Sequence, residues 1–297
     1  MVFERLPNRA RVAVIRLRSL GDCVLTTPAL DILKTARPDL RVAVVVEDRF
    51  APVFEGNPAV EALLPPRIPA LRDWQPDLCL NLHGGSRSAA LTAASGAKIR
   101  AGFAHFRFAQ AYTVKIPTAQ QILGVDRVVH TAEHLASAVF YLGAPRMEIP
   151  RARLSAVSRT NPKPYAVIHP VASQPNKTWP AERFLDVADR LEMEPVFIAG
   201  PGEDLTPFKK YRILSGAPLA EIKNLLANAT LFLGNDSGPA HMAAAFGLPV
   251  IVLFGASNID VWRPWKTCSE ALSSPDGIAS ISTEQVMSAL ARLRVHA

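Results

Sequence analysis

Short apolar runs alternate with amphipathic segments along almost the whole sequence. In the first half, we expect strands at residues 11–17, 41–46 and 77–82 and helices near residues 23–36, 86–94 and 130–142. In the second half, we expect strands at residues 165–169, 195–199, 229–234 and 249–254 and helices near residues 180–192, 218–228 and 239–246. This alternation is typical of βα units on a parallel sheet, so the predicted fold class is α/β.

The chain has 297 residues, which favours two domains over a single core. A stretch with four prolines and little periodicity, residues 144–164, separates the two series of expected strands. We therefore predict domains at residues 1–155 and 156–297, each with its own parallel sheet. The last helix, expected at residues 283–294 after a capping-box pair at Ser282 and Gln285, is predicted to pack back on the first domain.

Several protein classes are disfavoured by what the sequence lacks. Apolar runs are all shorter than the roughly 18 residues of a membrane span, and the N-terminus lacks the charged-then-apolar order of a signal peptide. We therefore expect a soluble, cytoplasmic protein. The three cysteines are widely spaced and unpaired in sequence, which argues against a disulfide framework and against a zinc site.

The charge is distributed unevenly between the two halves. Residues 1–155 carry 20 Lys and Arg against 13 Asp and Glu, whereas residues 156–297 carry 13 of each. A basic half indicates an anionic partner such as phosphorylated lipid headgroups, an acidic sugar or nucleic acid, or else a solvated surface without a partner. Nucleic acid is not expected, because the arginines are scattered and no binding motif accompanies them.

The stretch RLRSLGDCVLTTPAL, residues 16–30, follows the first expected strand and places Asp22 directly after Gly21. One interpretation is that Asp22 caps the helix that begins there. The other is that its carboxylate faces the crevice beyond the sheet, where open α/β folds bind ligands. Local sequence alone leaves both interpretations open.

A second strand-turn-helix, LFLGNDSGPAHMAAAFGLPVIVLFG, begins at Leu231. Pro239 suits a first helical turn, Gly247 can end the helix, and Gly238 permits close approach of a ligand to a helix start that favours phosphate. Asp236 would then cap the helix or bind a sugar hydroxyl. His241 is either close to that ligand or an ordinary buried histidine. The nicotinamide GxGxxG, Walker A, GxSxG and DxD patterns are all missing from the sequence.

Three motifs together resemble family 9 glycosyltransferases, which include the ADP-heptose:lipopolysaccharide heptosyltransferases. They are RLRSLGDCVLTTPAL, HPVASQPNKTWPAERF from His169, and GNDSGPAHMAAAFGLPVIVLFG. Weaker similarity in NLHGGSRSAALTAASGAKIRAGF and ASISTEQVMSALARL extends the resemblance over nearly the whole chain. Ala172 departs from the family, which often has a hydroxyl residue there, and two later segments are short. These departures bear on the donor sugar and the acceptor more than on the reaction type.

The resemblance implies a GT-B fold, with two Rossmann-like domains facing a cleft, the first binding the acceptor and the second the nucleotide sugar. It implies inverting, metal-independent transfer from an ADP-sugar, with no further cofactor, and Asp22 as the catalytic base. By motif, the expected donor contacts are Ser173, Lys177, Glu203, Asp236, Ser237, Gly238 and His241. From the basic first half, the expected acceptor contacts are Arg16, Arg18, His83, Arg87, Lys98, Arg100 and Arg107. His83 is also the next candidate for the base.

The expected acceptor is an anionic glycolipid of the lipopolysaccharide core, reached by transient association with the inner face of the cytoplasmic membrane. Two other classes stay open. A sugar-nucleotide epimerase would share the fold and donor site but would need no acceptor, which the basic half and Asp22 argue against. A non-catalytic nucleotide-sugar binding protein would keep the donor loop without needing Asp22.

Overall fold

The computed structural model describes residues 1–157 and 163–293. By its internal contacts, the chain divides into two compact units, Met1–Ser155 and Ala156–Ala297. Part of the proline-containing stretch, residues 158–162, and the last residue of the expected final helix, residue 294, lie outside the described residues.

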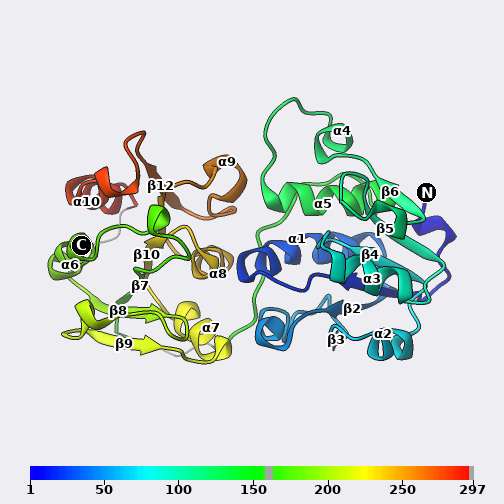
Figure 1. Ribbon diagram of the computed structural model, residues 1–297, viewed down its shortest axis with the longest axis horizontal. Coiled ribbons are helices and arrows are strands. Elements are labelled where there is room, and N and C mark those ends of the chain that lie inside the picture. The colour runs from blue at the N-terminus through cyan, green and yellow to red at the C-terminus, as the bar shows by residue number, and fades with distance from the viewer. Residues whose placement is uncertain (158–162, 294–297) are drawn as a thin grey trace. The chain divides into compact units, whose positions relative to one another are not determined.

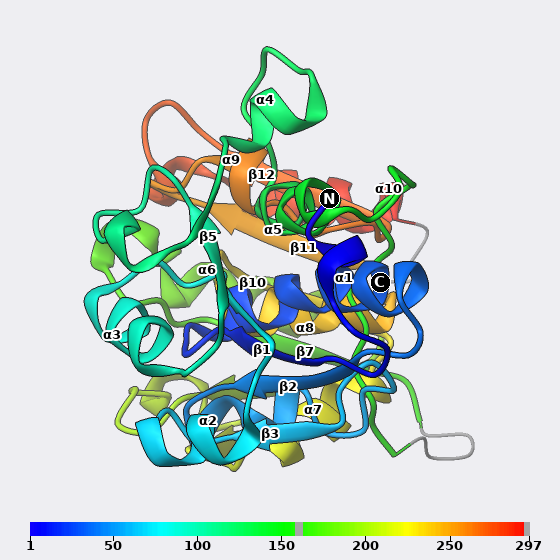
Figure 2. The same cartoon turned by 90° about the vertical axis from the view of Figure 1, so that its right-hand side faces the viewer.

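The first unit is built on a six-stranded parallel sheet with strand order β3-β2-β1-β4-β5-β6. Its strands are β1 (Arg11–Ile15), β2 (Arg41–Val45), β3 (Ala62–Leu64), β4 (Leu78–Asn81), β5 (Ile99–Phe103) and β6 (Val114–Ile116). Its α-helices are α1 (Leu20–Ala36), α2 (Ile68–Trp74), α3 (Ser86–Ala94), α4 (Ala119–Leu123) and α5 (Thr131–Leu142), and its 3-10 turns are η1 (Phe3–Arg5), η2 (Asp48–Val53) and η3 (Ala109–Ala111). Helix α1 packs against α5 and α2 packs against α3, the two pairs covering opposite faces of the sheet (Figure 2).

The second unit repeats this plan, with strand order β12-β11-β10-β7-β8-β9. Its strands, all parallel, are β7 (Tyr165–His169), β8 (Glu194–Ala199), β9 (Arg212–Ser215), β10 (Leu231–Asn235), β11 (Val250–Phe254) and β12 (Ser269–Ser273). Its α-helices are α6 (Ala181–Arg190), α7 (Leu219–Ala227), α8 (Gly238–Phe246), α9 (Ile259–Trp262) and α10 (Thr283–Arg292), and its 3-10 turns are η4 (Pro175–Lys177), η5 (Thr206–Phe208) and η6 (Ile278–Ser280) (Figure 1).

Both sheets have the doubly wound order, in which successive strands are added first toward one side of the sheet and then toward the other, and the switch lies between two central strands. The central strands are buried on both faces, as their continuous apolar runs require: Val12 to Ile15 of β1 are fully inaccessible to solvent. The α/β prediction and the seven strands expected from apolar runs are confirmed. Among the described residues, no helix is both long and apolar enough to cross a membrane.

The last helix, α10, packs within the second unit. Its capping box at Ser282 and Gln285 is present as predicted. Its apolar residues Val286, Ala289 and Leu290, however, are completely buried in the core of the second unit, where α10 contacts α6 and β11. The apolar face of α10 is thus used within the second unit, and packing of this helix on the first domain stays a prediction.

Candidate functional site

The carboxyl ends of β1 and β4 lie side by side in the first unit, because these two strands are hydrogen-bonded neighbours. They are the strands at which the sheet reverses its winding, the position where ligands bind in open α/β sheets. Asp22 lies in the first turn of α1, directly after β1, and His83 follows β4. The topology thus brings together the two candidates for a proton acceptor.

The Asp22 carboxylate is held by two side chains. The Ser19 hydroxyl donates to Asp22 Oδ2 over 3.1 Å, and Arg16 Nη1 lies 3.3 Å from Asp22 Oδ1. The N-cap position of α1 belongs to Ser19, and no side chain caps the helix there. The capping interpretation of Asp22 is therefore disfavoured, while the carboxylate remains 24% exposed and open to a ligand.

Arg16 is a buried cation beneath this carboxylate. Only 5% of the residue is exposed, and its Nη2 donates to the carbonyl of Leu82, in the turn after β4. Burial lowers the pKa of Arg16, and the nearby Asp22 opposes that shift. The guanidinium is thus committed to Asp22 and Leu82. Arg16 thus joins Asp22 to the turn after β4, and its contact with an acceptor stays a prediction.

The turn after β4 is also well defined. Asn81 Oδ1 accepts from the backbone N–H groups of His83 and Gly84, over 2.9 and 3.1 Å. Gly84 has a φ of +81°, and a Cβ there would lie 2.8 Å from the Phe106 ring, so only glycine fits. Burial, with help from the charge of Arg16, lowers the pKa of His83, while Asp22 opposes the shift. His83 is therefore a neutral imidazole within the field of the Asp22 carboxylate.

A cluster of rings that the sequence analysis missed lies over this turn. His134 of α5 stacks on Phe103 with centroids 4.0 Å apart, and His105 and Phe106 each lie within 5.5 Å of Phe103. Burial lowers the pKa of His134 to about 4, and the charges of Arg16 and Asp22 also act on it. The four residues come from β5, the loop after it and α5, so no spacing in the sequence identifies them as neighbours.

Three of the predicted acceptor contacts are exposed arginines that follow strands of the first unit. Arg18, Arg87 and Arg107 follow β1, β4 and β5 respectively and are exposed; we call them the carboxyl-edge arginines. Arg87 also forms an ion pair, its Nη1 lying 3.4 Å from Glu47 Oε1. The group lies at the same edge of the sheet as Asp22. These three side chains remain candidates for contact with an anion.

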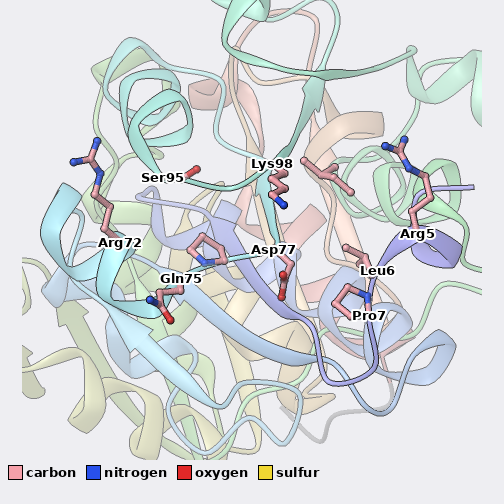
Figure 3. Close-up of a pocket in the computed structure, with 11 residues that line it drawn as sticks. Arg5, Leu6, Pro7, Arg72, Gln75, Asp77, Ser95 and Lys98 are labelled. Carbon is pink, nitrogen blue, oxygen red and sulfur yellow. The ribbon is translucent and has the colours of Figure 1, made fainter.

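Lys98 and Arg100 do not belong to that edge. Lys98 directly precedes β5, and the Arg100 guanidinium donates to the carbonyls of Ala97 and Ala111. Lys98 instead lines a cavity of about 640 Å³ at the amino ends of β4 and β5, where it faces Asp77 (Figure 3). Lys98 and Arg100 therefore lie at the opposite end of their strand from the carboxyl end where Asp22 lies, and their contact with an acceptor stays a prediction.

The second unit presents a corresponding edge where β7 and β10 end. His169, the last residue of β7, lies with its Nδ1 3.0 Å from the Ser237 hydroxyl oxygen at the N-cap of α8. Asp236 precedes Ser237 and is half-buried. Burial raises the pKa of Asp236, and the Ser257 side chain and the charge of Lys177 oppose that shift. As predicted, Pro239 lies in the first turn of α8 and Gly247 ends the helix with a φ of +78°.

Lys177 belongs to a loop that is fixed on both sides. A Cβ at Gly255, after β11, would come within 2.0 Å of the Asn176 carbonyl oxygen, so this glycine allows the loop to lie against the sheet edge. On the other side, Trp179 is completely buried and donates its backbone N–H to Asn235 Oδ1 over 3.0 Å. The backbone that carries Lys177 is therefore held beside the end of β10.

The other predicted donor residues differ in exposure. Ser173 is exposed in the loop after β7. Glu203, after β8, is exposed and accepts from the backbone N–H of Gly200 over 2.6 Å. His241 is only 4% exposed, with its ring 6.1 Å from that of Trp262. All of them follow strands of the second unit at their carboxyl ends, and Gly238 begins α8. Within residues 1–157 and 163–293, no three His, Cys, Asp or Glu residues group as a metal site would require.

Comparison with known proteins places these features in context. The sequence model of Glycosyltransferase family 9 (heptosyltransferase) matches residues 68–289. Lipopolysaccharide heptosyltransferase 3 of Escherichia coli is 29% identical over 84% of each chain. A family 9 glycosyl transferase from Veillonella parvula has a similar structure, with a TM-score of 0.85, 24% identity and 98% of each chain covered. The E. coli heptosyltransferase WaaC, solved with ADP, gives a TM-score of 0.78 at 18% identity, covering 95% of this chain and 99% of the other. These likenesses show the GT-B fold that the motifs implied.

Proposed function

Because this chain belongs to glycosyltransferase family 9 (heptosyltransferase), it is a glycosyltransferase, and we propose that it transfers a heptose or similar sugar from an ADP-sugar to an anionic acceptor of the lipopolysaccharide core. The observation that carries the proposal is the Asp22 carboxylate, held by Ser19 and Arg16 where the sheet of the first unit reverses. We further propose that transfer inverts the anomeric centre and needs no metal ion.

The second unit supplies the proposed donor site. Solved relatives of this fold are described with ADP and with an ADP-heptose analogue. In this chain, Lys177 and the backbone N–H groups at Ser237 and Gly238 would face the diphosphate, since all lie at the carboxyl edge of the sheet. Asp236 and Glu203 carry acceptors suited to sugar hydroxyls. Ser173 and His241 complete the proposed donor contacts.

The proposed chemistry is a single displacement. An acceptor hydroxyl attacks the anomeric carbon, the bond from that carbon to the diphosphate oxygen breaks, and ADP leaves with the bonding electrons. Asp22 takes the hydroxyl proton as general base. The positive charge of Lys177 and the N–H groups at the start of α8 stabilise the negative charge that develops on the leaving diphosphate. In the first unit, the neutral His83 would lie beside Asp22 at the acceptor hydroxyl.

The carboxyl-edge arginines are proposed to bind the acidic groups of the acceptor. They lie at the same edge of the first unit as Asp22 and are exposed. An anionic glycolipid acceptor would draw the protein transiently to the inner face of the cytoplasmic membrane, and we propose a cytoplasmic location for the rest of its cycle. No nucleic acid partner is proposed.

Incubation with ADP-heptose, with and without a lipid A–Kdo acceptor, tests this function. Release of ADP that requires the acceptor, together with a heptosylated lipid and no loss of rate in EDTA, would support the proposed transfer and its independence of metal, and the configuration of the new glycosidic bond in that lipid tests inversion. A changed sugar nucleotide without acceptor would indicate an epimerase instead. Binding of ADP-heptose with no turnover under either condition would indicate a non-catalytic binding protein.

A further inference from the structure

His169 and Ser237 meet across two neighbouring strands of the second unit. Strands β7 and β10 are neighbours in the sheet, and His169, the last residue of β7, has Gly234 of β10 as its partner in register. A Cβ at Gly234 would lie 2.8 Å from the His169 carbonyl oxygen and 3.1 Å from His169 Cβ, so glycine leaves the room that the imidazole occupies. Only 7% of the residue is exposed, and its Nδ1 lies 3.0 Å from Ser237 Oγ. A strand-end histidine is thereby fixed against the turn that begins α8.

Ser237 does not use its hydroxyl as N-cap serines usually do. A serine at this position normally accepts from a backbone N–H two or three residues later. In α8 the residue two positions later is Pro239, which has no N–H, and Ser237 makes no side-chain cap bond. The N–H of Ala240 goes to the backbone carbonyl of Ser237 over 3.2 Å instead. Among the residues that the structure describes, His169 is therefore the one hydrogen-bond partner of the Ser237 hydroxyl.

The hydrogen between His169 and Ser237 decides what the hydroxyl can do. Burial lowers the pKa of His169 to about 4, so at neutral pH the ring carries one N–H. If Nδ1 is bare, Ser237 must donate its hydrogen to the ring. If Nδ1 carries the hydrogen, the ring donates to Ser237 Oγ, and the hydroxyl hydrogen is left for another acceptor. A phosphate oxygen is acceptor-only, so a bound phosphate selects the second arrangement.

We propose that His169 is a positioning residue, which donates its Nδ1 hydrogen to Ser237 so that the Ser237 hydroxyl donates to a phosphate oxygen of a nucleoside diphosphate. The inference rests on the proposed function, because it takes the start of α8 as the donor site. It adds a residue that does not itself touch the donor. It also gives the Ser237 side chain, and not only the Ser237 backbone N–H, a contact with the diphosphate.

Calorimetric titration of the full chain with ADP tests the pairing. Ser237→Ala should weaken ADP binding about tenfold or more, the range for a hydrogen bond to a charged group. His169→Leu should weaken it similarly, and the double variant should be no weaker than either single one. His169→Asn is nearly the same size as His169→Leu, but its amide lies where Nδ1 lies and can donate, so it should recover most of the affinity.

Adenosine and a matched serine provide the controls. Adenosine lacks the phosphates, so its affinity should not change in His169→Leu. Ser282→Ala removes a true capping serine from α10 and should lower the melting temperature while leaving ADP affinity unchanged. If His169→Leu does not fold, His169→Gln replaces it, because its longer amide reaches past the Nδ1 position.

The possible results separate this inference from the proposed function. Wild-type affinity for ADP in His169→Leu, additive losses in the double variant, or wild-type affinity in Ser237→Ala would each overturn the pairing. An equal loss for adenosine would also overturn it, because it would show a general disturbance of the fold. If the wild-type chain does not bind ADP, the proposed function fails and the inference with it.

Discussion

Replacing Asp22 by Asn tests the proposed base most directly. The change keeps the size of the side chain and one acceptor oxygen, but it removes the negative charge and the ability to take a proton. General-base assistance typically contributes 10²–10⁴-fold, so kcat should fall by about that factor. The Michaelis constant for the ADP-sugar should change little, because the proposed donor contacts all belong to the second unit.

The structure also sets the expected loss of stability. Asp22 is paired with Arg16, whose side chain is 6% exposed, while that of Asp22 is 24% exposed. Breaking a fully buried pair costs about 3–5 kcal/mol and an exposed one about 0–1 kcal/mol. Arg16 keeps the Leu82 carbonyl, and the new amide oxygen can still accept from it. We therefore expect a loss of about 1–2 kcal/mol, a fall in melting temperature of roughly 2–8 °C.

Asp31 provides a matched control within the same helix. It is 15% exposed in its side chain and lies 3.6 Å from Arg153, so Asp31→Asn also breaks a partly buried ion pair of α1. Asp31 lies toward the other end of the helix from Asp22. Arg153 is 58% exposed and burial raises the pKa of Asp31, so Asp31→Asn should change the melting temperature less than Asp22→Asn, and it should leave kcat within about twofold, the scale of a variant without a catalytic role. Turnover by acceptor-dependent ADP release, measured beside melting, distinguishes the two. A folded Asp22→Asn protein with normal kcat would refute the assignment, and His83 would be tested next.

Four further results are expected. Lys177→Ala should weaken ADP-sugar binding about tenfold or more, measured as the donor Michaelis constant, while EDTA leaves the wild-type rate unchanged. Neutralising the carboxyl-edge arginines should raise the acceptor Michaelis constant and reduce its salt dependence; a salt-insensitive constant would contradict their role. Gly255→Ala should fail to fold or melt far lower, because its Cβ would meet Asn176. His134 and His169 have a lowered pKa of about 4, against 6.5 in an unfolded chain, so the unfolded chain binds more protons between those values. The free energy of unfolding should therefore decrease as the pH is lowered from about 6.5 to about 4, by up to roughly 3 kcal/mol per histidine in chemical denaturation, and a flat profile would contradict the burial argument.

The sequence revealed the centre of each sheet more readily than its margins. Central strands such as Arg11–Ile15 are buried on both faces, so they are continuous apolar runs that stand out from their surroundings. Edge strands such as Ala62–Leu64 and Ser269–Ser273 are short and half-exposed, and their mixed composition gives no such contrast. Strand β5 was missed although it is central, because Ile99–Phe103 contains a charged residue and a glycine.

The candidate site shows the same division between local and distant information. Asp22 and His83 could be selected because each directly follows an apolar strand, a property of the local sequence. The pairing of Arg16 with Leu82 joins residues 66 positions apart and depends on which strands are neighbours. Lys98 was assigned to the site from its charge alone. Its place before β5 rather than after it puts it at the amino end of that strand, away from the end where Asp22 lies, which residue type cannot reveal.

In both units, a buried side chain holds together the two turns at the point where the sheet reverses its winding. In each, the turns after the first and fourth strands must keep a fixed geometry at the point where the sheet reverses. In the first unit, Arg16 reaches from the end of β1 to the carbonyl of Leu82 after β4. In the second, His169 reaches from the end of β7 to Ser237 after β10. Each buried side chain thus joins the two turns and orients a polar group, Asp22 or Ser237, that faces a substrate in the proposed reaction. Fixed polar groups need no reorganisation as charge develops. Substitution of Arg16 or His169 is therefore expected to affect turnover or binding more than stability.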